Sequence, residues 1–162
     1  MANPIPYSAP FGAALDVVLF ESEAVLPTKA YSRSAAYDLS AYMMTVATKR
    51  ALTRTISPQS TVLIPTGIGL RPPFGHVILI CSRSGLAEKS VFVANGPGVV
   101  DPDYTGEIKV LLFNGGLEPC YVRHGDRIAQ ALVVPLASLP LKVIAEMPDT
   151  ERGPKGFGST GK

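Results

Sequence analysis

Frequent chain-breaking residues constrain this sequence more than any other feature. Fifteen glycines and fifteen prolines are spread over its 162 residues, and they separate short runs rich in β-branched and aromatic side chains. Runs of this kind, bounded by turn-forming residues, are typical of strands in sandwiches and barrels. The pattern contains no long amphipathic helix and predicts an all-β fold. The expected strands are 17–20, 61–64, 76–81, 90–94, 107–113, 120–123, 128–135 and 141–145.

One short helix is expected within residues 84–89, where good helix formers follow one another. It would place Ser84 near a helix N-terminus. Free backbone N–H groups there, with Arg83 alongside, suit an anion.

Length and charge limit the classes of function. A chain of 162 residues with 46% hydrophobic content fits one domain with one core. A net charge of +2, with 17% charged residues, is too small and too scattered for a duplex-binding surface, so stable nucleic-acid binding is not expected. The basic residues suit a small polyanion better.

The cysteines and the N-terminal residues indicate where in the cell the protein is expected. Cys81 and Cys120 lie in apolar strand-like runs, so buried free thiols are expected instead of a disulfide. The N-terminus has no secretory pattern, and no window reaches 18 apolar residues. We therefore expect an intracellular protein, cytoplasmic or nuclear, that is neither secreted nor bound to a membrane. His76 and His124 lack metal-ligand spacing and are expected to be structural or surface residues.

Residues 98–110 (GVVDPDYTGEIKV) place an acidic turn with one aromatic between two β-branched runs, which predicts a hairpin built to hold a ligand. Gly98 lets the backbone approach that ligand closely. Asp101 and Asp103 put carboxylates at the bend, where one could activate water. The alternative is that both acids only cap backbone groups of the turn.

Four further motifs accompany the predicted hairpin. They are 34–39 (SAAYDL), 82–87 (SRSGLA), 125–130 (GDRIAQ) and 152–161 (RGPKGFGSTG). The five motifs, in this order and with this spacing, resemble those of the trimeric dUTPases, from about Leu15 to the end of the chain. The resemblance implies a jelly-roll or distorted β-barrel and a homotrimer with shared active sites. Expected regions are a flexible Pro/Ala-rich segment 1–13, the β domain 14–146, and a flexible Gly-rich tail 147–162 that closes a neighbouring subunit's site.

The resemblance also implies hydrolysis of dUTP to dUMP and pyrophosphate, which limits uracil in DNA and supplies dUMP for dTTP synthesis. Asp101 would be the base that activates water for attack at the α-phosphorus, and Asp103 would structure the turn. Asp38 would hold Mg²⁺ through water, or would instead simply pair with an arginine. Asp126 and Arg127 would lock their turn and the subunit packing.

Substrate contacts are implied for residues in four of the five motifs, and for one residue outside the motifs, Asn95. Asn95 and the backbone of Gly98 and Val99 would read uracil, and Tyr104 would pack on the deoxyribose. Phe157 would stack on the base, and Arg152 would pair with the γ-phosphate. The full set is Arg83, Ser84, Gly85, Asn95, Gly98, Val99, Val100, Tyr104, Lys109, Gln130, Arg152, Phe157, Gly158, Ser159 and Thr160.

Two positions depart from the family pattern, because Ala36 and Lys155 stand where glycines are usual. Neither change removes a catalytic group. Two other functions compete with dUTP hydrolysis. A dCTP deaminase would share a related fold, but it lacks the Asp-x-Asp-Tyr sequence found at residues 101–104. A non-catalytic dUTPase-like module that binds protein partners would not need these acids or the tail motif.

Overall fold

The structure is a computed structural model that describes residues 14–45, 47–48 and 50–156. Short strands dominate it, and its one helix, α1 (Ser84–Ala87), has four residues. This confirms the expected all-β class with one short helix. The strands are β1 (Asp16–Leu19), β2 (Tyr37–Ser40), β3 (Thr53–Ile56), β4 (Ser60–Pro65), β5 (Ile68–Arg71), β6 (His76–Cys81), β7 (Val91–Val93), β8 (Gly98–Val100), β9 (Lys109–Asn114), β10 (Cys120–Arg123) and β11 (Arg127–Pro135).

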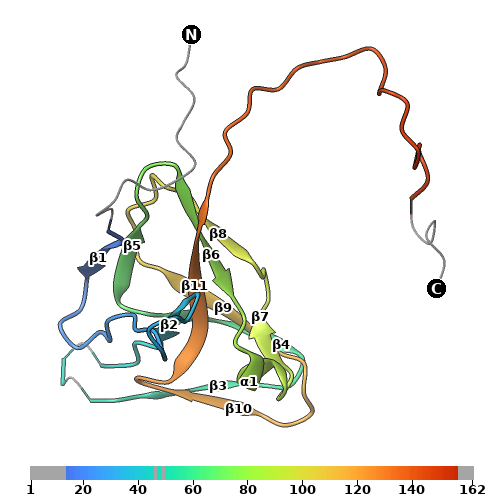
Figure 1. Cartoon of the computed structure of the whole chain (residues 1–162). Helices are drawn as coiled ribbons and strands as arrows, with labels where there is room; N and C mark the ends of the chain where they lie inside the picture. Colours follow the sequence, from blue (N-terminus) through green and yellow to red (C-terminus); the bar gives the residue numbers. More distant parts are fainter. Residues whose placement is uncertain (1–13, 46, 49, 157–162) are drawn as a thin grey trace.

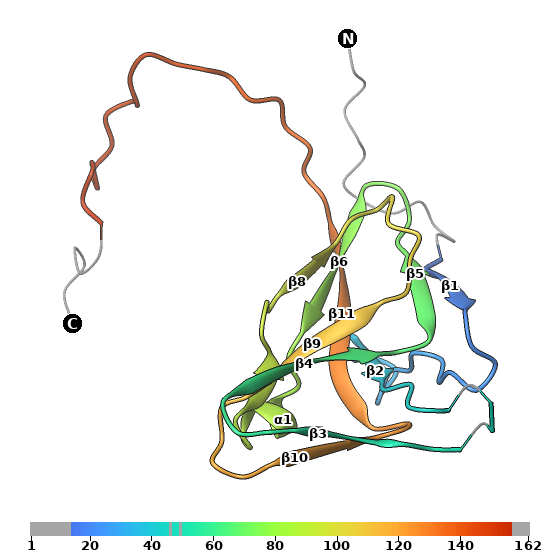
Figure 2. The same ribbon diagram turned by 180° about the vertical axis from the view of Figure 1, so that it is seen from behind.

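The strands form four small antiparallel sheets that face one another, as in a jelly roll (Figure 1). The largest has the order β2-β11-β6-β8, and the next has the order β4-β9-β7. The pairs β1-β5 and β10-β3 make the other two. In both views β11 runs through the middle of the domain (Figures 1 and 2), and it pairs with β2 on one side and β6 on the other.

The core lies between these sheets and follows from alternation along the strands. In β9, Val110, Leu112 and Asn114 are buried and the residues between them are more exposed, because successive side chains of a strand point to opposite faces. Asn114 is the polar member of this row. Its amide donates to the carbonyls of Ile56 and Glu118 at 2.9 and 2.8 Å, which satisfies the buried group.

The expected hairpin over residues 98–110 is not present. Strand β8 pairs with β6, whereas β9 pairs with β4 and β7, so the two strands belong to different sheets. Residues 101–108 are a connection between sheets. Nothing in the local sequence indicates that β8 has a better partner upstream, in β6.

The expected strand over 141–145 is also wrong for the single chain. After β11 the backbone leaves the sheets and runs out to one side in both views (Figures 1 and 2), and residues 136–156 contain no strand. Leu141 and Val143 are fully exposed, at 101% and 97% of their reference areas. These apolar side chains pack against no surface within the described residues.

Cys81 and Cys120 are free thiols, as expected, but each is half-buried and not fully buried. His76 and His124 have structural roles. The Nδ1 of His124 accepts a hydrogen bond from the Met43 N–H, and His76 is buried against the Phe74 carbonyl. In the described part of the chain, no helix has the length and apolar character needed to cross a lipid bilayer.

Candidate functional site

A pocket of about 300 Å³ opens between β8 and the start of β9. Strand β8 is the last strand of its sheet, and within the described residues its backbone bonds only to β6. One edge of β8 is therefore free. The pocket is lined by Ile80, Val93, Asn95, Gly98, Val99, Val100, Asp101, Tyr104, Glu107, Ile108, Lys109, Val110 and Leu111.

Seven residues expected to contact substrate or water thus meet in one place, although they span two sheets. Gly98 lines this pocket, and a Cβ atom there would be 3.2 Å from the Asn95 amide nitrogen and 3.5 Å from the Ile80 Cβ. A larger residue would therefore fill space beside Asn95. The close approach expected of Gly98 agrees with this geometry.

Asp101 presents an exposed carboxylate to the pocket. The turn that follows is closed by the Tyr104 N–H, which donates to the Asp101 carbonyl at 3.1 Å. Neither the Asp101 nor the Asp103 carboxylate accepts a hydrogen bond from the residues that the structure describes. The alternative in which both acids cap the turn is therefore wrong, and so is the turn-structuring role expected of Asp103.

Tyr104 also forms part of the pocket wall. Its hydroxyl donates to the Glu107 carbonyl at 2.9 Å, and its ring covers Gly106 so closely that a Cβ there would lie 2.7 Å from the Tyr104 Cζ. Lys109 borders the same wall, with its ammonium 3.5 Å from the Glu107 carboxylate. The ring is held on a short connection and is not part of a strand.

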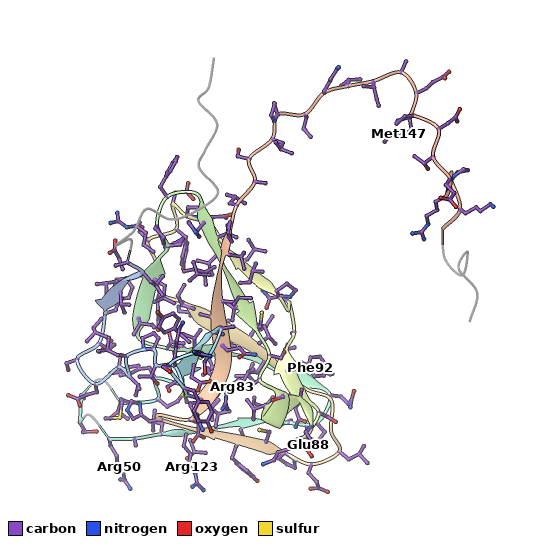
Figure 3. The ribbon with its side chains drawn as sticks, viewed as in Figure 1. Arg50, Arg83, Glu88, Phe92, Arg123 and Met147 are labelled. Atoms are coloured by element: carbon purple, nitrogen blue, oxygen red, sulfur yellow. The ribbon has the colours of Figure 1, made fainter. Side chains whose placement is uncertain are left out.

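Two further expected site residues, Arg83 and Gln130, lie elsewhere, near Asp38. The Nε of Arg83 donates to Asp38 Oδ1 at 2.9 Å, and the Nη1 of Arg127 donates to Oδ2 at 3.1 Å. Asp38 therefore pairs with two arginines, one of the two alternatives stated above. Gln130 donates to the Ser82 carbonyl at 2.9 Å, and together with Asp38 it lines a second pocket that also includes Cys81. Figure 3 labels Arg83 on the main body of the domain.

Ser84 and Gly85 are exposed at the start of α1, which follows Arg83. No side chain caps this helix, so its first backbone N–H groups remain available. A Cβ on Gly85 would meet nothing within 4 Å. The surface here is open enough for a phosphate chain to approach.

The tail carries the other expected contacts away from both pockets. Arg152 is exposed, and its Nε donates to the Lys155 carbonyl at 3.2 Å. Figure 3 shows Met147 on the arc of the tail, far from the sheets. Phe157, Gly158, Ser159 and Thr160 lie outside the described residues.

The sequence missed two groups at these sites. Glu107 lines the first pocket, but in the sequence it was only the first residue of the strand expected over 107–113. Arg127 was expected to lock a turn and subunit packing, yet it also pairs with Asp38. A signal for Arg127 existed, because a lone acid in one motif and arginines in two others suit an ion-pair cluster.

The side chains that could bind a metal show how the expected Mg²⁺ would have to be held. Within the described ranges, no three His, Cys, Asp or Glu side chains gather into a metal cluster, and both oxygens of Asp38 already accept from guanidinium groups. These residues do not fit a metal held directly by several protein ligands. They fit a Mg²⁺ that arrives on phosphate oxygens and keeps its water, as this ion commonly does.

Comparison with known proteins agrees with this arrangement. The sequence profile of the dUTPase family matches residues 22–161. The deoxyuridine 5'-triphosphate nucleotidohydrolase of Mus musculus is 41% identical over 152 residues, which cover 93% of this chain and 87% of that protein. The corresponding protein of Desulfotalea psychrophila is 47% identical over 108 residues, covering 66% and 72%.

Solved structures give the same result at the level of the fold. The dUTPase of Staphylococcus bacteriophage 80alpha with dUpNHpp superposes with a TM-score of 0.77 at 27% identity, covering 92% of this chain and 99% of the phage chain. A mutant of that protein, also with dUpNHpp, gives a TM-score of 0.80 at 26% identity, with the same coverage. The family profile and the mouse relative each extend over most of the sequence, and the chain belongs to the dUTPase family.

Proposed function

We propose that this protein is a dUTP diphosphatase, which hydrolyses dUTP to dUMP and pyrophosphate and so limits uracil in DNA and supplies dUMP for dTTP synthesis. The observation that carries the proposal is the pocket at the free edge of β8. It brings together a strand edge and a carboxylate that have no hydrogen-bond partner among the described residues, and an aromatic ring. Family membership and two curated relatives that bear the name of this activity support it.

The free edge of β8 suits recognition of uracil. An edge strand presents unpaired N–H and C=O groups, and uracil presents acceptor and donor groups in one plane. Backbone groups of Gly98 and Val99, with the Asn95 amide beside them, would pair with that edge. Cytosine would leave buried groups unpaired, which is worth roughly 10⁴-fold in discrimination.

The walls of the pocket suit the rest of the nucleoside. Val99 and Val100 would flank the base, and Gly98 would keep the backbone close enough to exclude the methyl group of thymine. The Tyr104 ring would pack on the deoxyribose and leave no room for a 2′-hydroxyl. Lys109 would lie beside the nucleotide.

Asp101 would activate the water. Its carboxylate has no hydrogen-bond partner among the described residues, so it is free to accept a proton from water bound at the pocket mouth. The resulting hydroxide attacks the α-phosphorus, a new P–O bond forms, and the bond from the α-phosphorus to the bridging oxygen breaks. Pyrophosphate leaves with that electron pair, and the proton remains on Asp101 until it passes to solvent.

Phosphate binding would come from the Asp38 region of a neighbouring copy. Ile80 lines the first pocket and Cys81 lines the second, and consecutive side chains of a strand point to opposite faces of a sheet. The two pockets therefore open on opposite faces, and one nucleotide would not reach both within one chain. Arg83, Ser84, Gly85 and Gln130 would then act on a triphosphate held by another subunit, and a homotrimer would form three such sites.

The tail would complete the site. Leu141 and Val143 are fully exposed, which favours docking of this segment on a second copy. Residues 147–162 would then lie over the neighbour's nucleotide, with Phe157 on the base and with Arg152, Gly158, Ser159 and Thr160 at the phosphates. Mg²⁺ bound to the triphosphate would neutralise phosphate charge, and Asp38 would contact its water shell.

Product analysis tests the proposed function against its alternatives. Incubation with dUTP and Mg²⁺ is expected to yield dUMP and pyrophosphate in equal amounts, measured by chromatography. Ammonia released from dCTP would instead identify a deaminase. Neither product, from protein whose circular dichroism shows a folded β domain, would favour a binding module without activity.

A further inference from the structure

We propose that Glu107 is a positioning residue that sets the preference for deoxyribose over ribose, because it fixes the pocket wall that carries Tyr104. The inference rests on the proposed function and adds a residue to which that function assigns no role. Glu107 lies between the expected sugar contact and the rest of the fold, and it lines the pocket itself.

Three hydrogen bonds attach residues 107–108 to residues 66–68, which comprise the turn after β4 and the first residue of β5. The Gly67 N–H donates to Glu107 Oε1 at 2.8 Å, and the Ile108 N–H donates to the Ile68 carbonyl at 2.8 Å. The hydroxyl of Thr66, which is buried, donates to the Ile108 carbonyl. Only the first of these bonds uses a side chain of the pocket wall.

The anchor at Gly67 is itself rigid. Gly67 adopts φ +70°, and a Cβ there would lie 2.8 Å from the Ala24 Cβ and 3.1 Å from the Tyr42 ring. Its carbonyl accepts from the N–H groups of Phe20 and Glu21 at 2.9 and 3.3 Å. The Glu107 carboxylate is therefore held by a backbone group that has little freedom to move.

Tyr104 depends on this attachment through the main chain of Glu107. Its hydroxyl donates to the Glu107 carbonyl at 2.9 Å, and its ring lies on Gly106. Tyr104 is 46% exposed, and within the described residues the bond to Glu107 is the hydrogen bond that its side chain makes. If the Glu107 side chain no longer bound Gly67, the 104–107 segment would loosen, and the ring would move away from the position that excludes a 2′-hydroxyl.

The hydrogen bond matters more here than the charge of Glu107. The Lys109 ammonium lies 3.5 Å from Glu107 Oε2, and the Lys109 side chain is 48% exposed, a setting in which ion pairs contribute little. The bond from Gly67 joins a part-buried pair. Glutamine at position 107 would keep an acceptor for Gly67 and lose only the ion pair.

The experiment compares kcat/KM for dUTP and UTP in the wild type and four variants, with equilibrium binding of both nucleotides measured alongside. Glu107→Ala and Glu107→Met remove the acceptor, and Met preserves the length of the side chain if the alanine variant does not fold. In both, the dUTP/UTP ratio is expected to fall by about tenfold or more, the equivalent of about 1.4 kcal/mol, because a lost positioning bond is worth about that much. Glu107→Gln is expected to restore a ratio close to that of the wild type.

Thr66→Val is the matched control. It removes the bond to Ile108 and is expected to lower the melting temperature while keeping the dUTP/UTP ratio. An unchanged ratio in Glu107→Met, or an equal loss in Glu107→Gln or Thr66→Val, would overturn the role of Glu107. A wild type that neither binds nor hydrolyses dUTP would reject the proposed function and this inference with it. A wild type that hydrolyses dUTP, together with a Met variant of normal selectivity, would reject only the inference.

Discussion

Asp101 is the residue on which the proposed chemistry depends most, since its carboxylate faces the pocket with no hydrogen bond to the described residues. Asp101→Asn keeps the shape of the side chain and removes the base. We expect kcat for dUTP to fall by about 10² to 10⁴, the usual contribution of a general base, while the affinity for a non-hydrolysable dUTP analogue stays close to that of the wild type. Pyrophosphate release and titration calorimetry measure the two quantities.

Asp103 provides the control for this variant. It lies two residues away on the same exposed connection, but it does not line the pocket. Asp103→Asn should therefore change kcat little. Normal turnover in Asp101→Asn, or an equal loss in Asp103→Asn, would contradict the assignment of the base.

Cys120 allows a prediction about pH. Burial raises the pKa of the Cys120 thiol, the Asp126 carboxylate raises it further, and Lys89 opposes the shift. Less thiolate is therefore present at a given pH in the folded protein than in the unfolded chain. In a Cys81→Ser background, the pH profile of alkylation, followed by mass spectrometry, should have its midpoint above that of a cysteine peptide.

The sign of this effect can be checked in the same experiment. Full denaturation exposes the thiol, so the midpoint should move down to that of the peptide. Because the folded state disfavours the thiolate, raising the pH through the pKa of the unfolded thiol should also lower the free energy of unfolding. A folded midpoint at or below that of the peptide would show that the stated cause is wrong.

At the scale of elements, the Asp38 cluster joins three parts of the fold that are distant in sequence. Asp38 is on β2, Arg83 follows β6, and Arg127 begins β11. Asp38→Ala would leave two guanidinium groups facing each other without their acceptor. We expect a loss of about 1 to 3 kcal/mol in the free energy of unfolding, measured by urea denaturation at fixed protein concentration.

An exposed pair elsewhere in the chain is the comparison. Asp16 and Arg71 join β1 to β5, and their side chains are 56% and 67% exposed. Asp16→Ala should cost about 0 to 1 kcal/mol, as is usual for surface ion pairs. Equal losses of unfolding free energy in the two variants would mean that the Asp38 cluster stabilises the fold no more than a surface ion pair does.

Much of the strand content could be predicted from sequence, and what was missed has physical reasons. Strands such as β6 and β11 are long β-branched runs, and the sequence located both. Three short strands (β2, β3 and β5) were missed, because Tyr-Asp-Leu-Ser or Ile-Gly-Leu-Arg has weak local preference and becomes a strand through pairing. The run that forms β8 was expected, but as one arm of a hairpin with the wrong partner. Sheet partners, as at β8, depend on the whole fold.

In the candidate site, too, some residues could be predicted from sequence and others depend on contacts made by the whole fold. The residues of the β8 pocket could be named because the family pattern orders them, and the structure places seven of them together. Glu107 could not be found, since its role arises from contact with Gly67, forty residues away. The expected strand over 141–145 has the alternation of a strand but no neighbour in one chain, and alternation alone cannot say whether a partner belongs to another copy.

At the scale of the whole molecule, exposed apolar side chains and the two opposed pockets favour the proposed assembly of several chains. Leu139 and Leu141, on the segment that follows β11, and Met147, at the start of the tail, are each at least 76% exposed. Light scattering is expected to give the mass of a trimer. Leu141→Asp with Val143→Asp should weaken assembly, whereas Lys142→Asp, on the same segment, should not. A monomer that hydrolyses dUTP at the normal rate would contradict the shared site.

Mixing two inactive variants tests the shared site most directly. A chain that lacks residues 152–162 keeps Asp101 but has lost the part of the tail expected to contact the nucleotide. Asp101→Asn keeps the whole tail but has no base. Each alone should fold, assemble and turn over dUTP slowly. After the two are unfolded together and refolded, some sites will combine Asp101 of one chain with the tail of another, and hydrolysis should return. If base and tail acted within one chain, no mixed site would contain both, and the mixture would stay as slow as its components.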